Sequence, residues 1–346
     1  MADRRSELTI PPLDAAARAT AADRQSRLTK PPGSLGRLET MAADIAAMQS
    51  TTEPTVDPAV VVTMAADHGV ATEGVSAYPQ SITAGMVRNF QEGGAAVTAL
   101  CDANGIENVV VDMGVAGEVP DAVVDKRIAE GTANIAEGPA MSREQAREAI
   151  AAGRSVVADQ AVEARIVGLG EMGIGNTTPS AAITALVTDQ PVEAVTGHGT
   201  GIDEETRARK VEIIERAIET TDPDPTEPID VLRSVGGFEI AGLVGVTLAA
   251  ASRRTPVVVD GVIAGAAALL AAELEPQVAD YLLGSHASVA PGHEAQLDSL
   301  GVDPCFDYGM RLGEGTGAAV AIGIYRAACA AHTGMSTLAE AGLDVE

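Results

Sequence analysis

The sequence predicts an α/β protein built on a mainly parallel sheet that is flanked by helices. Short runs rich in Val and Ile recur with helical stretches between them, which is typical of βαβ units, and five or six such units can be counted. Nearly all of the runs are continuously apolar, as expected for strands covered on both faces. The candidate strands are Ala59 to Thr63, Asn108 to Asp112, Arg165 to Leu169, Glu193 to Thr196 and Pro256 to Asp260.

The stretches between these runs predict crossover helices. Ser142 to Glu163 and Asp203 to Glu219 show helical periodicity with charged outer faces, and Ser142 with Gln145 resembles a capping box. The longest apolar run, Gly261 to Ala272, falls short of the roughly 20 residues that a membrane span needs, so it predicts a buried helix.

Both ends of the chain lie outside this alternation and are mostly helical in pattern. We expect residues 1–50 and roughly 280–346 to meet as a small helical domain beside an α/β domain of residues 51–280. The Pro-rich stretch Asp222 to Pro228 predicts a surface connection. Because aromatic residues make up only 2% and Trp is absent, the core must be built from Ala, Val, Ile and Leu, which implies closely packed helices.

The charge and the cysteines narrow the classes of partner. The net charge is -26 with only three lysines, so nucleic acid is an unfavourable partner, and a small phosphate-bearing substrate would need a dedicated pocket. Cys101, Cys305 and Cys329 are widely separated and fit neither a disulfide framework nor a zinc knuckle. No signal peptide pattern opens the sequence. A cytoplasmic protein that neither spans nor binds a membrane is expected.

The acidity also predicts a dependence on salt. Self-repulsion among 49 acidic residues is screened by ions, so we interpret the composition as an adaptation to high salt. The melting temperature is expected to rise with salt concentration, with loss of structure in low-salt buffer. Thermal melts across a salt series check this, and a salt-independent melting temperature would contradict it.

The candidate site lies in the segments that follow the strands, because ligands of parallel sheets bind beyond the carboxyl ends of the strands. Gly168 to Ser180 is rich in Gly and hydroxyl groups and opens a helix, which suits a phosphate, although it matches neither a Walker loop nor a G-x-G-x-x-G fingerprint. Gly197 to Gly201 supplies a second flexible loop near Lys210. A structural turn and a surface lysine are the alternatives for these features.

Two acidic residues share a Gly-rich setting. Glu314 stands between glycines just before a helix that begins near Thr316, and Glu171 lies in the first Gly-rich loop. A capping acid is the simpler interpretation of Glu314 alone, since carboxylates stabilise helix N-termini. Two carboxylates on such loops also suit acid/base chemistry. His68, His198, His286 and His293 lack ligand spacing, so structural or loop roles are expected for them.

Taken together, the motifs resemble the nicotinate-nucleotide:dimethylbenzimidazole phosphoribosyltransferase family of cobalamin synthesis. They run in family order over nearly the whole chain. The matching segments are LTKPPGSLGRLE (28–39), AADHGVATEGVSAYPQSIT (65–83), GTANIAEGPAMSREQA (131–146), GEMGIGNTTPSAA (170–182), VGGFEIAG (235–242), VVVDG (257–261), SHASVAPGH (285–293) and MRLGEGTGAA (310–319).

The resemblance implies a Rossmann-like large domain, a small domain from both chain ends, and a homodimer with active sites near the subunit interface. Glu314 matches the family's general base, and Ser76 and Met86 fall where the benzimidazole binds; some relatives carry Gln in place of Met86. The implied catalytic residues are Glu314 and Glu171, and the implied substrate-binding residues are Ser76, Met86, Met172, Gly173, Gly175, Asn176, Thr177, Gly199, Lys210, Ser285, Ser288, Gly313 and Gly315.

The chemistry of the implied reaction agrees with a single base. Nicotinate leaves its mononucleotide as a neutral ring, so no general acid is required, whereas the attacking benzimidazole must lose a proton to a carboxylate. The surroundings of Glu314 should therefore keep it ionised, and no metal or redox cofactor is demanded. The alternatives are transfer to adenine or a phenol, a non-catalytic nucleotide-binding relative and a Rossmann oxidoreductase. The intact RLGEGTGA motif and the irregular Gly pattern argue against the last two.

Overall fold

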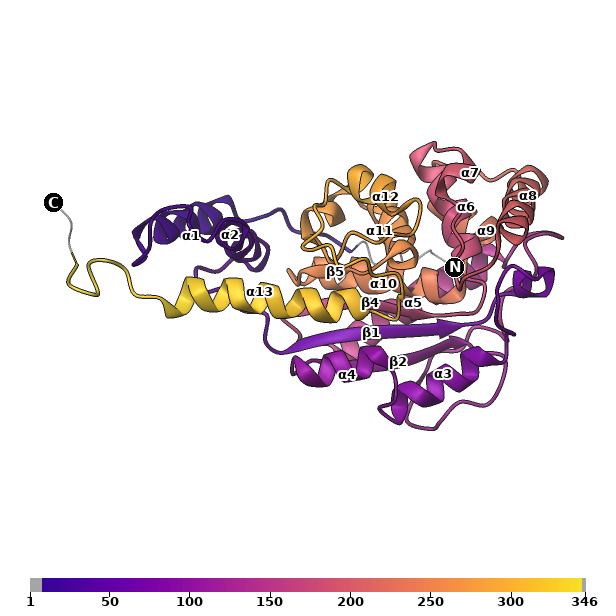
Figure 1. Ribbon diagram of the computed structural model, residues 1–346, viewed down its shortest axis with the longest axis horizontal. Coiled ribbons are helices and arrows are strands. Elements are labelled where there is room, and N and C mark those ends of the chain that lie inside the picture. Colours follow the sequence, from indigo (N-terminus) through magenta and orange to yellow (C-terminus); the bar gives the residue numbers. More distant parts are fainter. Residues whose placement is uncertain (1–7, 344–346) are drawn as a thin grey trace, which may run out of the picture.

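The computed structural model describes residues 8–343 and confirms the α/β class. Six strands form one sheet in the order β3-β2-β1-β4-β5-β6, and every neighbouring pair among them is parallel (Figure 1). The strands are β1 (Ala59–Ala66), β2 (Glu107–Gly114), β3 (Val124–Asp125), β4 (Ile166–Met172), β5 (Val257–Val259) and β6 (Leu282–Gly284). β1 is buried along its whole length, as its continuous apolar sequence predicts.

One predicted strand is wrong. Glu193 to Thr196 does not join the sheet, because Val192–Val195 form the short helix α7 between α6 and α8. Pro191 precedes the helix, and the Thr196 hydroxyl closes it by donating to the Val192 carbonyl at 2.7 Å. The other four predicted strands are confirmed, while the short strands β3 and β6 were not predicted.

The helices account for most of the remaining chain. The Ser142 capping box at the start of α5 is confirmed, and the apolar run at 261–272 forms the buried helix α11. The α-helices are α1 (Ala15–Arg27), α2 (Arg37–Gln49), α3 (Ile82–Gln91), α4 (Ala96–Ala103), α5 (Arg143–Gln160), α6 (Thr177–Thr188), α7 (Val192–Val195), α8 (Glu204–Thr221), α9 (Pro228–Val235), α10 (Phe238–Ser252), α11 (Val262–Leu274), α12 (His293–Leu300) and α13 (Thr316–Gly334). Two 3₁₀ helices, η1 (Gly69–Glu73) and η2 (Pro276–Tyr281), follow β1 and α11.

The sheet is covered on both faces. Gly168 on β4 faces α13, because a side chain there would meet Ala318. Met64 on β1 has the opposite pleat and packs against Gly242 of α10, since side chains alternate along a strand. Helix α13 therefore covers one face and α10 the other, and both helices begin at the carboxyl edge of the sheet.

A close helix crossing stabilises the α10 face. A Cβ atom at Gly153 of α5 would lie 1.9 Å from the Gly242 carbonyl oxygen of α10, and one at Gly245 would lie 2.1 Å from the Ile150 carbonyl oxygen. The two backbones thus touch without side chains between them. This is the close packing that the Ala- and Gly-rich composition predicts.

The chain ends meet beside the sheet. Helices α1 and α2 pack on each other and on α13, and Arg24 donates to the carbonyls of His332 and Met335 at 3.0 Å each (Figure 1). In contrast, β6 belongs to the sheet and α12 packs on α11 and α6. The division into 1–50 with 280–346 and 51–280 stays a prediction.

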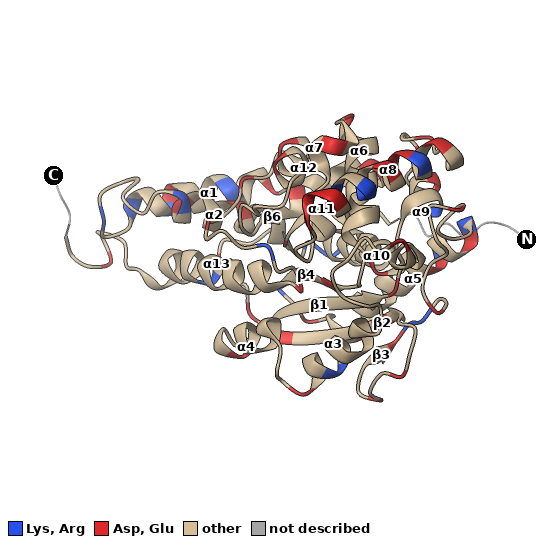
Figure 2. Cartoon of the chain, turned by 45° about the vertical axis from the view of Figure 1, so that its right-hand side comes forward, with Lys and Arg blue, Asp and Glu red and all other residues tan. Residues whose placement is uncertain are grey.

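The surface carries the acidic charge in many small groups. Figure 2 shows acidic residues on several helices, α8 among them, where basic residues lie between the acidic ones. The connection after α8 is mostly exposed, as predicted for the Pro-rich stretch Asp222 to Pro228. Within the described residues no helix is long and apolar enough to cross a membrane.

Candidate active site

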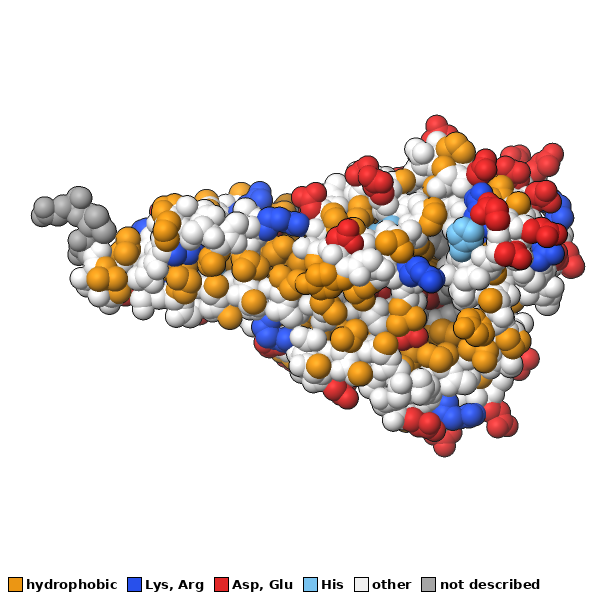
Figure 3. Space-filling view, in the orientation of Figure 1, with side chains coloured by type: hydrophobic (Ala, Val, Ile, Leu, Met, Phe, Trp, Pro, Cys, Tyr) orange, Lys and Arg blue, Asp and Glu red, His pale blue; other side chains and the backbone are white. Residues whose placement is uncertain are grey.

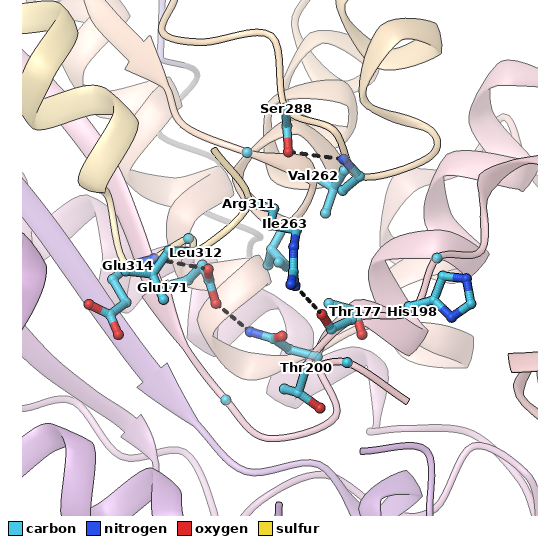
Figure 4. Close-up of a pocket in the computed structure, with 18 of the residues that line it drawn as sticks. Glu171, Thr177, His198, Thr200, Val262, Ile263, Ser288, Arg311, Leu312 and Glu314 are labelled. Atoms are coloured by element: carbon cyan, nitrogen blue, oxygen red, sulfur yellow. Dashed lines mark hydrogen bonds between the residues drawn. The ribbon is translucent and has the colours of Figure 1, made fainter. Parts of the chain in front are cut away.

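A cavity of about 1000 Å³ opens at the carboxyl edge of the sheet (Figure 4). Its walls come from the loop after β4, the loop after α7, the start of α11, the loop after β6 and the turn before α13. Exposed apolar side chains, among them Tyr78, Val289 and Leu312, stand at its rim. Figure 3 shows hydrophobic side chains over the middle of this view and acidic ones at its right-hand end.

Most of the implied site residues line this cavity. They are Met86, Glu171, Met172, Gly173, Asn176, Thr177, Gly199, Ser288, Gly313 and Glu314. The implied site thus draws together segments more than 200 residues apart in sequence.

Five implied residues lie just behind this lining. Ser76 reaches the rim through Thr200, whose hydroxyl lies 3.1 Å from its own. The Ser285 hydroxyl points back and donates to the Asp260 carbonyl at 2.8 Å. Gly175 supports the loop with a φ of 93°, where a side chain would be strained. The other two, Lys210 and Gly315, hold parts of the wall.

Glu314 is buried but not saturated with hydrogen bonds. Its side chain is only 7% exposed, and its Oε2 has no hydrogen-bond partner within residues 8–343. Burial raises the pKa of this carboxyl, whereas a hydrogen bond from the backbone N–H of Val97 lowers it by a smaller amount. Desolvation disfavours the charged form, and the expectation that the surroundings keep Glu314 ionised stays a prediction. A group with a raised pKa and a free oxygen is a better proton acceptor once the pH is high enough to ionise it.

Glu171 stands deeper and is already engaged. Burial raises its pKa to about 8, against the hydrogen bond from Asn176, and the nearby acids Asp260 and Glu239 add to the rise. Asn176 Nδ2 donates to its Oε2 at 2.5 Å, and the backbone N–H of Glu314 donates to its Oε1 at 3.3 Å (Figure 4). Both oxygens of Glu171 are thus occupied, whereas one oxygen of Glu314 is free.

Lys210 lies inside the protein. A surface position, the simpler interpretation from the helical pattern, is wrong, since the side chain is fully buried in α8. Its Nζ donates to the Thr177 hydroxyl at 2.6 Å, and burial lowers its pKa to about 7. Thr177 begins α6, whose N-terminus also carries partial positive charge. Thr177 lines the cavity, so the buried amine of Lys210 lies directly behind a helix N-terminus, and helix N-termini favour anions.

Several lining residues were missed from the sequence. Thr200 and Arg311 tie the loop after α7 to its neighbours: Thr200 Oγ1 accepts from Ala77 N at 3.0 Å, and Arg311 Nη1 donates to the Gly199 carbonyl at 3.3 Å. No local pattern marks either residue. Asp260, which lies behind the lining, could have been recognised from the sequence, because it ends a predicted strand at the edge where ligands bind.

The histidines make structural contacts, and two of them also line the cavity. His68 pairs with Glu239 at 2.8 Å in the interior, and His198 Nδ1 lies 2.9 Å from the Ile202 carbonyl within its own loop. His286 and His198 also line the cavity. Within residues 8–343 no group of three or more His, Cys, Asp or Glu side chains is placed to hold a metal ion.

Comparisons with known proteins agree with this geometry. A family model described as phosphoribosyltransferase matches residues 10–343. The nicotinate-nucleotide–dimethylbenzimidazole phosphoribosyltransferase of Roseiflexus sp. (strain RS-1) is 50% identical over 338 residues, covering 96% of each chain. The protein of that name from Chloroflexus aggregans is 48% identical over the same length, with 96% of each chain covered.

Solved structures show the same fold. The crystal structure of the enzyme with this name from Thermus thermophilus superposes with a TM-score of 0.91 at 41% identity, covering 96% of this chain and 100% of that one. A structure described as CobT from the same organism gives a TM-score of 0.92 at 42% identity with the same coverage. The chain therefore belongs to the nicotinate-nucleotide–dimethylbenzimidazole phosphoribosyltransferase family, and it is a phosphoribosyltransferase.

Proposed function

We propose that the chain transfers the 5-phosphoribosyl group of nicotinate mononucleotide to 5,6-dimethylbenzimidazole, which gives α-ribazole 5′-phosphate and nicotinate for the lower ligand of cobalamin. The observation that carries the proposal is a cavity that holds Thr177, at a helix N-terminus backed by the buried amine of Lys210, together with Glu314, whose Oε2 has no hydrogen-bond partner in the described residues. The donor of this reaction carries a phosphate, and its acceptor, the benzimidazole ring, must give up a proton.

Glu314 is the general base in this proposal. Nicotinate departs as a neutral ring, so the breaking glycosidic bond needs no proton donor. As one benzimidazole nitrogen attacks the anomeric carbon, the other becomes acidic and gives its proton to Glu314. Attack from the side opposite the departing ring inverts β to α. Glu171 is the weaker candidate for the base, because both of its oxygens already accept hydrogen bonds.

The remaining implied residues bind the substrates. The loop from Glu171 to Thr177 and the start of α6 hold the nucleotide, with Lys210 and Gly199 at its phosphate. Ser76 and Met86 belong to the acceptor side, and Ser285 and Ser288 support the loop that faces it. Positioning of two bound substrates supplies much of the rate, since it replaces a bimolecular encounter. Neither a metal ion nor a redox cofactor enters the proposal.

The deciding experiment is to incubate the purified protein with nicotinate mononucleotide and dimethylbenzimidazole. Chromatography with mass spectrometry should show equal amounts of nicotinate and a ribazole phosphate. Because the net charge is -26, the assay is run at several salt concentrations. Absence of both products at every salt concentration would refute the proposal. Competition with adenine and with a phenol identifies the preferred acceptor.

The finer assignments of assembly and compartment are also proposals. A homodimer is supported by the exposed apolar side chains at the rim, Tyr78, Val289 and Leu312, each more than half exposed in the single chain. Sedimentation analysis should give twice the mass of 35.1 kDa. A cytoplasmic location is supported by cysteines that are free in the described residues.

Lys210 predicts a pH dependence of nucleotide binding. In the free protein its pKa is about 7, lowered by burial, and a bound phosphate favours the charged form and so raises that pKa. Between the two values binding takes up a proton, so affinity for nicotinate mononucleotide should fall by up to about tenfold per pH unit above pH 7. The phosphate itself is mostly dianionic there, because its second pKa is about 6.

Calorimetric titration with nicotinate mononucleotide from pH 6 to pH 9 measures this dependence. Lys210→Met keeps the length of the side chain and removes its charge, so the variant should bind weakly and with little change over this range. A wild-type affinity that stays constant from pH 7 to pH 9 would exclude Lys210 from the phosphate site.

A further inference from the structure

We propose that Asp260 is a positioning residue for the transfer, because its carboxylate fixes the turn that carries Glu314. The turn consists of Gly313, Glu314 and Gly315 and leads into α13. The role of Asp260 in turnover rests on the proposed function, whereas its hold on the turn does not.

Both hydrogen bonds that the Asp260 carboxylate accepts within the described residues come from the start of α13. The residue follows β5 directly and is 1% exposed. Its Oδ2 accepts from Gly315 N at 3.1 Å, and its Oδ1 accepts from Ala318 N at 3.0 Å. These N–H groups belong to the first turn of α13, whose own N-cap, Gly315, has no side chain to satisfy them. Asp260, at the end of β5, therefore acts as the cap of α13.

The turn needs such a hold because its backbone is strained. Gly313, Glu314 and Gly315 have φ values of 82°, 64° and 91°, three left-handed residues in succession. Glycine tolerates this region, but a glutamate there costs energy and persists only where its surroundings impose it. Glu314 bears this conformational strain and lines the cavity, which indicates that its conformation is kept for function.

Asp260 makes the firmer contacts with the turn. Glu171 accepts from Glu314 N at 3.3 Å, and the Thr63 hydroxyl donates to the Glu314 carbonyl at 3.4 Å, both near the limit of a hydrogen bond. The Asp260 bond to Gly315 N is shorter, at 3.1 Å, and a second Asp260 bond, to Ala318 N at 3.0 Å, holds the first turn of α13 that follows. Loss of Asp260 would leave the turn with only these two longer bonds to the sheet, besides its local bonds from Thr316 to the Gly313 carbonyl.

The residues around Asp260 are closely packed against its carboxylate. A Cβ atom at Gly317 would lie 2.7 Å from Asp260 Oδ1 and 2.1 Å from His286 Nδ1. His286 Nδ1 stands 4.0 Å from Asp260 Oδ1, and the Ser285 hydroxyl lies 3.0 Å from that same ring nitrogen. A bare helix start thus sits directly on the carboxylate. A small change at Asp260 would therefore move the turn.

The electrostatics of the cluster make this hold sensitive to pH. Burial raises the pKa of Asp260 to about 7, against the backbone N–H groups of Ala318, Gly315 and Gly317, and the negative charge of Glu314 raises it further. The other titratable groups nearby are Glu171, His286 and His293, and burial lowers the pKa of His293 to about 4. Burial lowers the pKa of His286, so it adds no positive charge near neutral pH. Protonation of Asp260 below pH 7 would weaken its acceptance of the two N–H bonds.

The test compares Asp260→Asn with Asp112→Asn. Asp112 is also 1% exposed and caps two backbone N–H groups, those of Gly114 and Val115 at 2.9 and 2.8 Å, at the end of β2 and outside the cavity. Asp260→Asn should lower kcat on the order of 10²-fold with KM for nicotinate mononucleotide little changed, as misplacement of a catalytic group does. The acid limb of its pH profile should move to lower pH, because the variant lacks the carboxyl group whose protonation near pH 7 weakens the hold on the turn.

Asp112→Asn should keep the wild-type kcat per folded molecule and the wild-type pH profile. If Asp260→Asn also keeps both, or if the two variants lose activity alike, the inference is overturned. If the wild-type protein forms no ribazole phosphate, the proposed function fails instead, and the hold on the turn is judged by amide hydrogen exchange.

Hydrogen exchange of residues 311–319 also covers the case in which Asp260→Asn does not fold. In the wild-type protein, protection corrected for intrinsic exchange should fall in this segment between pH 8 and pH 6, while Gly114 and Val115 stay protected. Unchanged protection of residues 311–319 over that range would contradict the role given to Asp260.

Discussion

Glu314→Gln should leave a folded protein that binds both substrates but turns over roughly 10²- to 10⁴-fold more slowly, the usual contribution of a general base. The amide has the shape of the carboxylate and cannot take a proton from the benzimidazole. Its binding cost should be small, because one carboxylate oxygen has no partner in the described residues to lose. Single-turnover release of nicotinate at saturating substrate isolates the chemical step, and calorimetry verifies binding.

Glu171→Gln is the matched comparison. Its amide would face two N–H donors, Asn176 Nδ2 and Glu314 N, where the carboxylate accepts both. We therefore expect weaker nucleotide binding and a smaller loss of turnover than in Glu314→Gln. Near-normal turnover of Glu314→Gln, with a larger loss in Glu171→Gln, would transfer the role of base to Glu171.

Gly153→Val should be the most destabilising of the changes considered. The new Cβ atom would lie 1.9 Å from the Gly242 carbonyl oxygen, which belongs to helix backbone and cannot rotate away. Helices α5 and α10 would have to separate, at a cost of about 3 kcal/mol or more, the upper end for overpacked sites. For a chain of 346 residues that corresponds to a fall in melting temperature of roughly 1–2 °C per kcal/mol.

Gly85→Ala is the control for Gly153→Val. Gly85 lies in α3, has an ordinary φ and would place a Cβ atom where no other atom stands within 4 Å. Alanine there should stabilise the helix by about 0.5–1 kcal/mol. Urea midpoints with unchanged m values measure both effects. Equal midpoints for the two variants would show that the α5–α10 contact is looser than the structure indicates.

The sequence predicted the large features because local patterns determine them. Continuous apolar runs mark strands that are buried on both faces, so β1, β2, β4 and β5 could be found. The Ser142 capping box involves residues three positions apart, and it is present as predicted. The ordered motifs identified the family, which the relatives over 96% of the chain confirm. The catalytic role of Glu314 came with that resemblance and stays a prediction.

The tertiary structure alone decided the environment of each group. Val192–Val195 has the residues of a strand but no neighbouring strand to complete its hydrogen bonds, so it forms a helix. Lys210 has the pattern of a surface position, yet the packing of α8 beside α6 buries it. Asp260 meets the turn of Glu314 across 54 positions of sequence. Desolvation and hydrogen bonding depend on neighbours distant in the chain, and for this reason the pKa values and the positioning of the base could not be read from the sequence.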